Sequence, residues 1–161
     1  MTYEEVHLLY DKHASALLGY ACAFLGDRAE AEDVLHQVFL NLIRENRFPV
    51  DPVPYLFRAV RNTALNVRRQ QSRHMQLECQ HDWFDAPKDE RESALGLQAA
   101  VLLLPDEQRE VVVLHIWCEM TLLEVATFLG VSPNTVASRY RYGLSKLRES
   151  LQHSEGKDGR T

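Results

Sequence analysis

The residues with the richest chemistry lie between positions 132 and 148 of the 161-residue chain. They combine short hydrogen-bonding side chains with cations, a mixture that reads base edges and binds phosphates in the major groove of DNA. A helix that begins near Ser132 would place Asn134, Ser138 and Arg141 on its outward face, so we assign base contact to these three. The other candidates for DNA contact are Ser132, Thr135 and Tyr142, and the cations Arg139, Lys146 and Arg148, to which we assign phosphate contact.

The positions just before this segment predict a helix-turn-helix. Thr121 and Glu124 have the spacing of a capping box, which would start a short helix with an apolar inner face. Gly130 stands where the turn needs a positive φ. Ser132 and Pro133 then suit the N-cap and the first turn of the second helix. The alternative is an ordinary αα-hairpin packed on itself.

A second basic segment lies between residues 55 and 75, where arginines occur without an acid in a chain whose net charge is −5. Apolar residues at helical spacing predict a helix from about 54 to 75, preceded by a proline-rich loop at 46–54. Asn62 and Asn66 are four residues apart and would offer their amides from one helix face. The arginines that could bind phosphate here are Arg58, Arg61, Arg68 and Arg69. A solvated helix face is the alternative for the arginines.

The remaining motifs argue against an enzyme or a metalloprotein. The chain has no Walker loop, GxSxG, HExxH or GxGxxG sequence, so we expect no catalytic residue, cofactor or small-molecule substrate. Cys79 and His81 form the one pairing worth weighing as a metal site, and two ligands in a polar segment are too few to predict one. The longest apolar run, 99–104, is far shorter than the roughly 20 residues of a membrane span. The acidic N-terminal sequence lacks the features of a signal peptide, so we expect a cytoplasmic protein.

Helices must position these candidates, because no window alternates between apolar and polar residues as a strand does. We predict an all-α protein of two small helical domains, 1–75 and 93–151. A flexible acidic linker at 76–92 joins them, and a polar tail at 152–161 frays from His153.

The same periodicity predicts which side chains face inward. The apolar stripe of the second helix ends at Ile43, and the stripe that follows the linker includes Ala99 and Leu103. Cys22 and Cys118 lie beside apolar residues, and we interpret both as small core residues on helices.

At these positions the chain resembles bacterial RNA polymerase sigma factors. The C-terminal block is similar to sigma region 4 and the N-terminal block to region 2, in the family order over residues 3–151. The region 4 positions are Leu104-Pro105, Arg109, Glu124-Val125-Ala126, Leu129-Gly130-Val131, Thr135-Val136 and Ser138-Arg139. The region 2 positions are Ala31 to Phe39, Tyr55 to Arg58 and Arg61 to Asn66.

The resemblance implies an alternative sigma factor that binds core RNA polymerase and directs promoter-specific initiation. Only about 20 residues separate the two blocks, which is the layout of the extracytoplasmic-function (ECF) subgroup. By resemblance, the basic helix and the loop before it recognise and melt the minus-10 element, and the helix-turn-helix reads the minus-35 element. The minus-10 contacts that this implies are Arg58, Arg61, Asn62, Asn66, Arg68 and Arg69. The linker would thread a channel of the polymerase, and an anti-sigma factor would be a further partner. Polymerase docking is implied for Glu32, Asp33, His36 and Gln37.

The chain departs from the family pattern at several of these positions. His36 and Gln37 replace the usual glutamine and acidic residue, and Tyr55 replaces the usual tryptophan. Ala137 and Tyr142 replace usual basic residues on the predicted recognition helix, so the promoter sequence can differ from that of relatives.

Two other function classes are weighed beside this one. A helix-turn-helix regulator that binds duplex DNA without polymerase would account for residues 121–151 but not for the N-terminal block. An interaction protein, such as an anti-sigma antagonist or a polymerase-binding adaptor, would account for the acidity but not for two basic faces. Initiation by core polymerase in the presence of the protein would distinguish all three.

Overall fold

The computed structural model describes residues 2–46, 48–71 and 91–158. All regular elements within these ranges are α-helices, so the all-α prediction is confirmed. The predicted linker falls outside the described residues apart from its last two positions, which begin a helix. Cys79 and His81 also lie outside the described residues.

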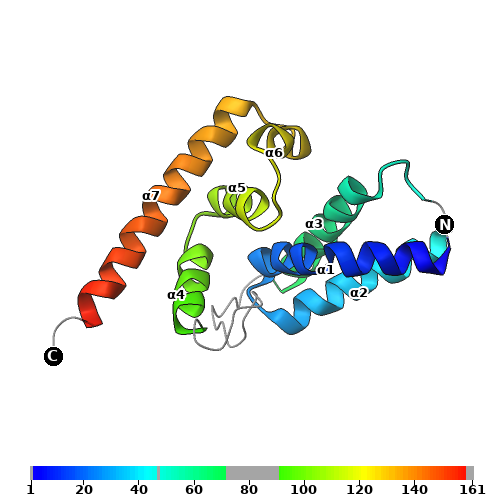
Figure 1. Ribbon diagram of the computed structural model, residues 1–161, viewed down its shortest axis with the longest axis horizontal. Coiled ribbons are helices and arrows are strands. Elements are labelled where there is room, and N and C mark those ends of the chain that lie inside the picture. The colour runs from blue at the N-terminus through cyan, green and yellow to red at the C-terminus, as the bar shows by residue number, and fades with distance from the viewer. Residues whose placement is uncertain (1, 47, 72–90, 159–161) are drawn as a thin grey trace. The chain divides into compact units, whose positions relative to one another are not determined.

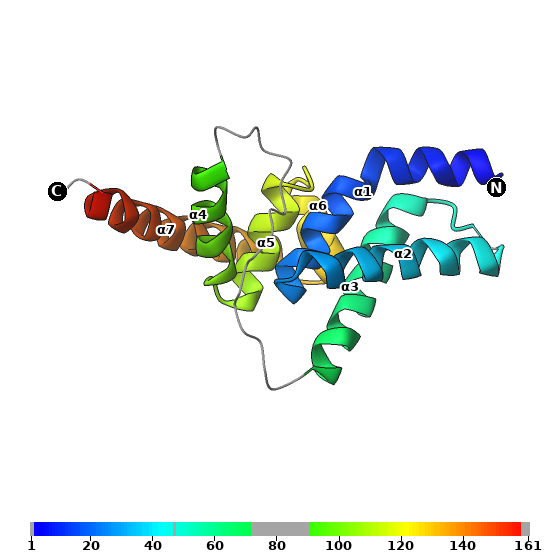
Figure 2. The same ribbon diagram turned by 90° about the horizontal axis from the view of Figure 1, so that it is seen from below.

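The chain divides into two compact units, Met1–Glu78 and Cys79–Thr161. The first contains α1 (Tyr3–Leu25), α2 (Arg28–Glu45) and α3 (Pro52–Gln70), and each of the three contacts the other two. Helix α3 crosses the pair formed by α1 and α2 (Figures 1 and 2).

Short local signals separate α1 from α2. Gly26 ends α1 at φ 67°, a left-handed conformation that glycine adopts without a steric penalty. Asp27 then caps α2, because its carboxylate accepts a hydrogen bond from the Glu30 amide at 3.1 Å. The two helices are therefore joined by a tight turn, which lets them pack along each other.

Aromatic side chains fill the core of the first unit. Tyr20 is fully buried and meets Phe24 edge to face at 5.1 Å and Phe57 of α3 at 5.8 Å. Tyr10 meets Phe39 of α2 edge to face, also at 5.1 Å. Such pairs contribute about 0.5–1.5 kcal/mol each beyond the area that they bury. They fix α2 and α3 on α1 and so determine which faces of both helices meet solvent.

The second unit contains α4 (Arg91–Leu102), α5 (Asp106–Ile116), α6 (Leu122–Leu129) and α7 (Pro133–Asp158). Helix α7 is the long helix of this unit, and α4, α5 and α6 all contact it (Figure 1).

Arg109 fastens the end of α4 to the start of α5. Its buried guanidinium donates to the carbonyl oxygens of Leu102 at 2.9 Å and Leu104 at 2.8 Å. The same nitrogen lies 3.3 Å from a carboxylate oxygen of Asp106. The arginine thereby satisfies carbonyls that the end of α4 leaves unpaired.

Two predicted helix boundaries were wrong. Helix α3 begins at Pro52, inside the segment we predicted as a loop, because proline suits the first turn of a helix, whose amides lack intrahelical partners. Helix α7 continues to Asp158, although we predicted fraying from His153. Its polar C-terminal segment contains no proline and several good helix formers, and Leu147 anchors it in the core.

Three predicted core positions and one predicted helical position also need correction. Ile43 is 46% exposed, and Leu103 is 69% exposed because it follows the last residue of α4. Ala99 is exposed because α4 packs through Gln98 and its neighbours instead. Cys22 is buried on α1 as predicted, whereas Cys118 lies in the turn after α5, where burial raises the pKa of its thiol to about 12.

Candidate nucleic-acid interface

The predicted helix-turn-helix is present, with the predicted caps. The Glu124 amide donates to the Thr121 hydroxyl at 3.1 Å, and the Thr121 amide donates to the Glu124 carboxylate at 2.8 Å. This reciprocal capping box starts α6. Gly130 ends α6 at φ 68°, and the Val131 amide returns to the Ala126 carbonyl at 3.1 Å. This tight turn therefore fixes the direction of α7 relative to α6.

The first turn of α7 uses two of the candidate side chains as caps. The Thr135 amide donates to the Ser132 hydroxyl at 3.2 Å, and the two hydroxyl oxygens lie 2.8 Å apart. Capping by serine contributes about 1 kcal/mol to a helix. Ser132 and Thr135 therefore order the start of α7.

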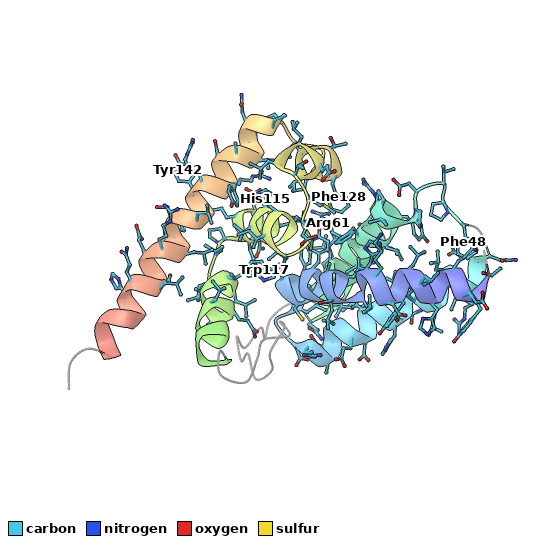
Figure 3. All side chains as sticks on the ribbon, in the orientation of Figure 1. Phe48, Arg61, His115, Trp117, Phe128 and Tyr142 are labelled. Carbon is cyan, nitrogen blue, oxygen red and sulfur yellow. The ribbon has the colours of Figure 1, made fainter. Side chains whose placement is uncertain are left out.

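The outward face of α7 gathers most of the predicted DNA-contacting side chains. Tyr142 is 58% exposed and points away from the unit (Figure 3), with the Arg141 guanidinium 5.7 Å from the centre of its ring. Ser138 is half-buried at the centre of this face. We call this face the α7 strip, and its members are Asn134, Ser138, Arg141, Tyr142, Lys146 and Arg148.

Arg139 lies at the edge of the α7 strip, on the side of Lys146 seven residues further on, and its side chain reaches α5. Its side chain is 24% exposed, and its Nη2 atom lies 3.4 Å from Glu107 Oε2 on α5. The sequence pattern placed Arg139 near the flank of the helix but did not show the carboxylate beside it.

A second contact between α5 and α7 also escaped the sequence analysis. The His115 ring meets Tyr140 edge to face at 4.8 Å, and His115 Nδ1 donates to the Met120 carbonyl oxygen at 2.7 Å (Figure 3 labels His115). His115 thereby links α7 to the turn that precedes α6. The only sequence signal for this contact was a histidine at the end of an apolar helix.

Helix α3 presents a second basic face. Arg58, Asn62, Asn66 and Arg69 are exposed and follow one another at spacings of four, four and three residues, which places them on one face. We call these four residues the α3 strip. Arg61 (Figure 3) and Arg68 are half-buried beside it, and both have partners within the protein, as does Arg58 of the strip. The six predicted residues thus separate into an exposed strip of four and a flank of two.

The C-terminal end of α3 is fastened to α2. The side-chain Nε2 of Gln71 donates to a carboxylate oxygen of Glu30 at 2.5 Å. This bond joins residues 41 positions apart in the sequence, so it orients the basic end of α3 on the rest of the unit.

Helix α2 carries the predicted polymerase-docking residues on its outer face. Asp33, His36 and Gln37 are exposed, while Glu32 is half-buried and bonds to Arg28 Nε at 3.0 Å. Gln37 donates to Asn41 at 2.8 Å. Leu40 and Ile43 continue the same face and are 48% and 46% exposed. The α2 strip is Asp33, His36, Gln37, Leu40 and Ile43, and the sequence analysis missed its two apolar members.

Comparisons with known proteins match both units. The family described as Sigma-70 region 2 matches residues 9–74, and the family described as Sigma-70, region 4 matches residues 94–147. The ECF RNA polymerase sigma factor SigL of Mycobacterium tuberculosis is 31% identical over 155 residues, covering 89% of this chain and 87% of SigL. The chain belongs to the ECF sigma factor family. CarQ, an RNA polymerase sigma factor of Myxococcus xanthus, is 30% identical over 158 residues and covers 91% of this sigma factor and 89% of its own length.

Solved structures share the fold of this sigma factor. CnrH, in complex with the cytosolic domain of CnrY, has a TM-score of 0.70 at 22% identity, covering 94% of this chain and 90% of that one. RpoE of Bartonella quintana, in complex with the anti-sigma factor NepR, has a TM-score of 0.73 at 19% identity, covering 92% and 98%.

Family membership decides between the function classes. The chain is an alternative sigma factor that directs promoter-specific transcription initiation with core RNA polymerase. A DNA-binding regulator that acts without polymerase would not contain the region 2 match at 9–74.

Within the described part of the sigma factor, no group of three or more His, Cys, Asp or Glu side chains is placed to hold a metal ion. None of its helices is long and apolar enough to cross a membrane.

Proposed function

We propose that the three exposed strips divide the work of initiation among α7, α3 and α2. The observation that carries this proposal is their position, because the α7 strip lies on the helix of the helix-turn-helix within the region 4 match, apart from Arg148 just beyond it. The other two strips lie within the region 2 match. The sigma factor acts by recognition rather than catalysis, in the cytoplasm with the polymerase.

The α7 strip reads the minus-35 element in the major groove. Arginine reads guanine through O6 and N7, and each bidentate contact discriminates by about 1–3 kcal/mol. Arg141 is exposed and lies beside Tyr142, whose ring limits the directions in which the guanidinium can extend. Asn134 and Ser138 share this face and supply shorter polar contacts. Lys146 and Arg148 lie further along the helix and bind phosphate.

The α3 strip binds the melted minus-10 element. Arg58 and Arg69 lie at the two ends of the α3 strip and neutralise the phosphates of a single strand. Asn62 and Asn66 lie between them and offer amide donors and acceptors to an extruded base. Polar contacts of this kind favour the unpaired base over the stacked one, and so they favour the open complex.

The α2 strip docks on core polymerase. Its polar end carries Asp33, His36 and Gln37, and its apolar end carries Leu40 and Ile43. Interfaces bury an apolar centre inside a polar rim, and this strip supplies both. A free sigma factor exposes this surface, and an anti-sigma factor that covers it would compete with polymerase.

A reconstituted transcription assay tests the proposal. Purified protein is mixed with core RNA polymerase and a library of promoter DNA, and specific initiation is the expected result. Core binding without initiation would identify a polymerase-binding adaptor instead. DNA binding by the protein alone, with no effect of polymerase, would contradict the assignment of the α2 strip.

A further inference from the structure

Two contacts hold one turn of α7 near the opposite ends of α5. Arg139 lies 3.4 Å from Glu107, which belongs to the first turn of α5. Tyr140 meets His115, in the last turn of α5, at 4.8 Å. Residues 107 and 115 are about 12 Å apart along a helix at 1.5 Å per residue. The two contacts therefore hold this turn of α7 at two points about 12 Å apart along α5.

Gly143 provides the close approach between the same two helices. A Cβ atom at this position would lie 2.9 Å from a methyl carbon of Val112, in the middle of α5. The α7 backbone therefore packs directly against the Val112 side chain and cannot move closer to α5 here, and Gly143 marks a point about which α7 can rotate. The contacts made by Arg139 and Tyr140 restrict that rotation from both sides.

The same turn of α7 also carries residues of the α7 strip. Ser138 precedes Arg139 and Tyr140 in the sequence, and Arg141 and Tyr142 follow them. Any rotation of this turn moves the hydrogen-bonding groups of the strip relative to the bases. Hydrogen bonds weaken steeply as their angles depart from linearity, so base contacts are more sensitive to such a rotation than phosphate contacts.

We propose that Glu107 is a positioning residue for minus-35 recognition, which acts by holding Arg139 as a brace between α5 and α7. The inference rests on the proposed minus-35 role of α7. On this proposal Arg139 fixes the position of α7 and does not contact phosphate, in keeping with a side chain that is only 24% exposed. The carboxylate of Glu107 is itself favoured where it stands, because the N-terminus of a helix carries partial positive charge.

Substitutions that remove the charges test the brace in the reconstituted holoenzyme. The variants are Glu107→Gln, Arg139→Gln and the two combined, with folding checked by circular dichroism. Affinity is measured over a range of salt for a promoter with its minus-35 element and for the same DNA with that element scrambled. We expect each single change to weaken specific binding about two- to fivefold, the scale of an exposed ion pair. The double variant should be no weaker than either single one.

The sign of the Glu107→Gln effect is decisive. Loss of a negative charge near DNA would by itself strengthen binding, so weaker specific binding supports the brace. Glu149→Gln makes the same charge change at an exposed position on α7 and serves as the control. Because Glu107 is 73% exposed, its replacement leaves the core of the unit intact.

The salt dependence separates a brace from a phosphate ligand. If Arg139 acts as a brace, its replacement leaves the slope of log affinity against log salt unchanged, and it does not change the affinity for the scrambled DNA. If Arg139→Gln flattens the slope by about 0.9 and weakens both DNAs equally, as expected for a lost phosphate contact, the brace is refuted. If the unaltered holoenzyme does not distinguish the two DNAs, the proposed minus-35 function fails instead.

Discussion

Arg141 and Arg148 lie seven residues apart on one face of α7, so distance along the helix separates their roles. Arg141 is in the third turn, beside Ser138 and Tyr142, where a helix in the major groove meets base edges. Arg148 is two turns further on, where a helix that lies in the major groove passes the phosphate backbone of the DNA. We expect Arg141 to select sequence and Arg148 to supply affinity without selection.

Alanine at each position tests this division. Arg141→Ala should relax the preference at one or two minus-35 positions, at a cost of about 1–3 kcal/mol for the preferred base. Arg148→Ala should weaken all promoters about equally and reduce the salt slope by about 0.9. Binding of a promoter library by the holoenzyme measures both effects. The reverse pattern, in which Arg148 changes sequence preference and Arg141 does not, would contradict the division.

Glu119 stores backbone strain in the turn between α5 and α6. It is an exposed non-glycine residue at φ 57°, and a side chain in this region costs about 1–2 kcal/mol. We expect Glu119→Gly to stabilise the protein by about 0.5–1 kcal/mol, after the entropy that glycine adds to the unfolded chain. Urea denaturation measures the change. Glu119→Ala keeps the Cβ atom and is the control, so an equal gain from alanine would show that strain is not the cause.

At the scale of elements, the crossing of α5 and α7 depends on one glycine. A Cβ at Gly143 would lie 2.9 Å from Val112, a fully buried and stiff β-branched side chain. Gly143→Ala should therefore destabilise the protein by about 1–3 kcal/mol, despite the better helix propensity of alanine. Gly96→Ala in α4 is the control, because nothing lies within 4 Å of its Cβ, and it should be stabilising. Equal effects at both glycines in thermal denaturation would contradict the close approach.

The apolar end of the α2 strip is tested by a charge. Leu40 is 48% exposed, so Leu40→Asp should leave folding nearly unchanged while placing a charge in the interface. Burying an unpaired charge is expensive, and we expect core-polymerase affinity to fall at least about tenfold. Leu8→Asp is the matched control, since Leu8 is 68% exposed on α1 outside the strip. Equal losses of affinity from both changes would show that the α2 strip has no special role.

Local signals predicted the caps and turns of these elements correctly. Thr121 with Glu124, Gly130 and Ser132 with Pro133 act within a few residues of chain, so the sequence alone determines them. The exposed faces of α7 and α3 followed from helical spacing for the same reason. What the sequence could not show was set by packing between helices.

Ile43 and Arg139 illustrate the part that packing decides. Ile43 fits the apolar stripe of α2, but the stripe drifts around the helix and leaves this residue 46% exposed at its end. Arg139 is one of several basic residues on α7, and only the crossing with α5 brings Glu107 to it. Contacts between residues about 30 positions apart have no periodic signature in a single sequence.

The whole molecule is acidic, although both of its candidate DNA-binding strips are basic. A net charge of −5 weakens the attraction of the chain for DNA in general, so binding depends on local charge. The α3 strip and the α7 strip lie in different compact units, Met1–Glu78 and Cys79–Thr161. One strip is proposed to act on melted DNA and the other on duplex DNA, so they contribute at successive steps of initiation.

Asn62 and Arg141 should therefore make independent contributions. Asn62→Ala removes an amide from the α3 strip and should reduce open-complex formation by about 1–3 kcal/mol, with core binding and minus-35 recognition unchanged. Arg141→Ala should weaken the closed complex and leave melting from that complex unchanged. Because the two side chains belong to separate units and are proposed to act on different forms of DNA, the double variant should show the sum of both effects within about 0.5 kcal/mol. Permanganate reactivity of the minus-10 region measures melting, and holoenzyme binding to closed promoters measures recognition. Wild-type permanganate reactivity in Asn62→Ala would remove the α3 strip from melting, and strong coupling in the double variant would show that the two strips act in one step.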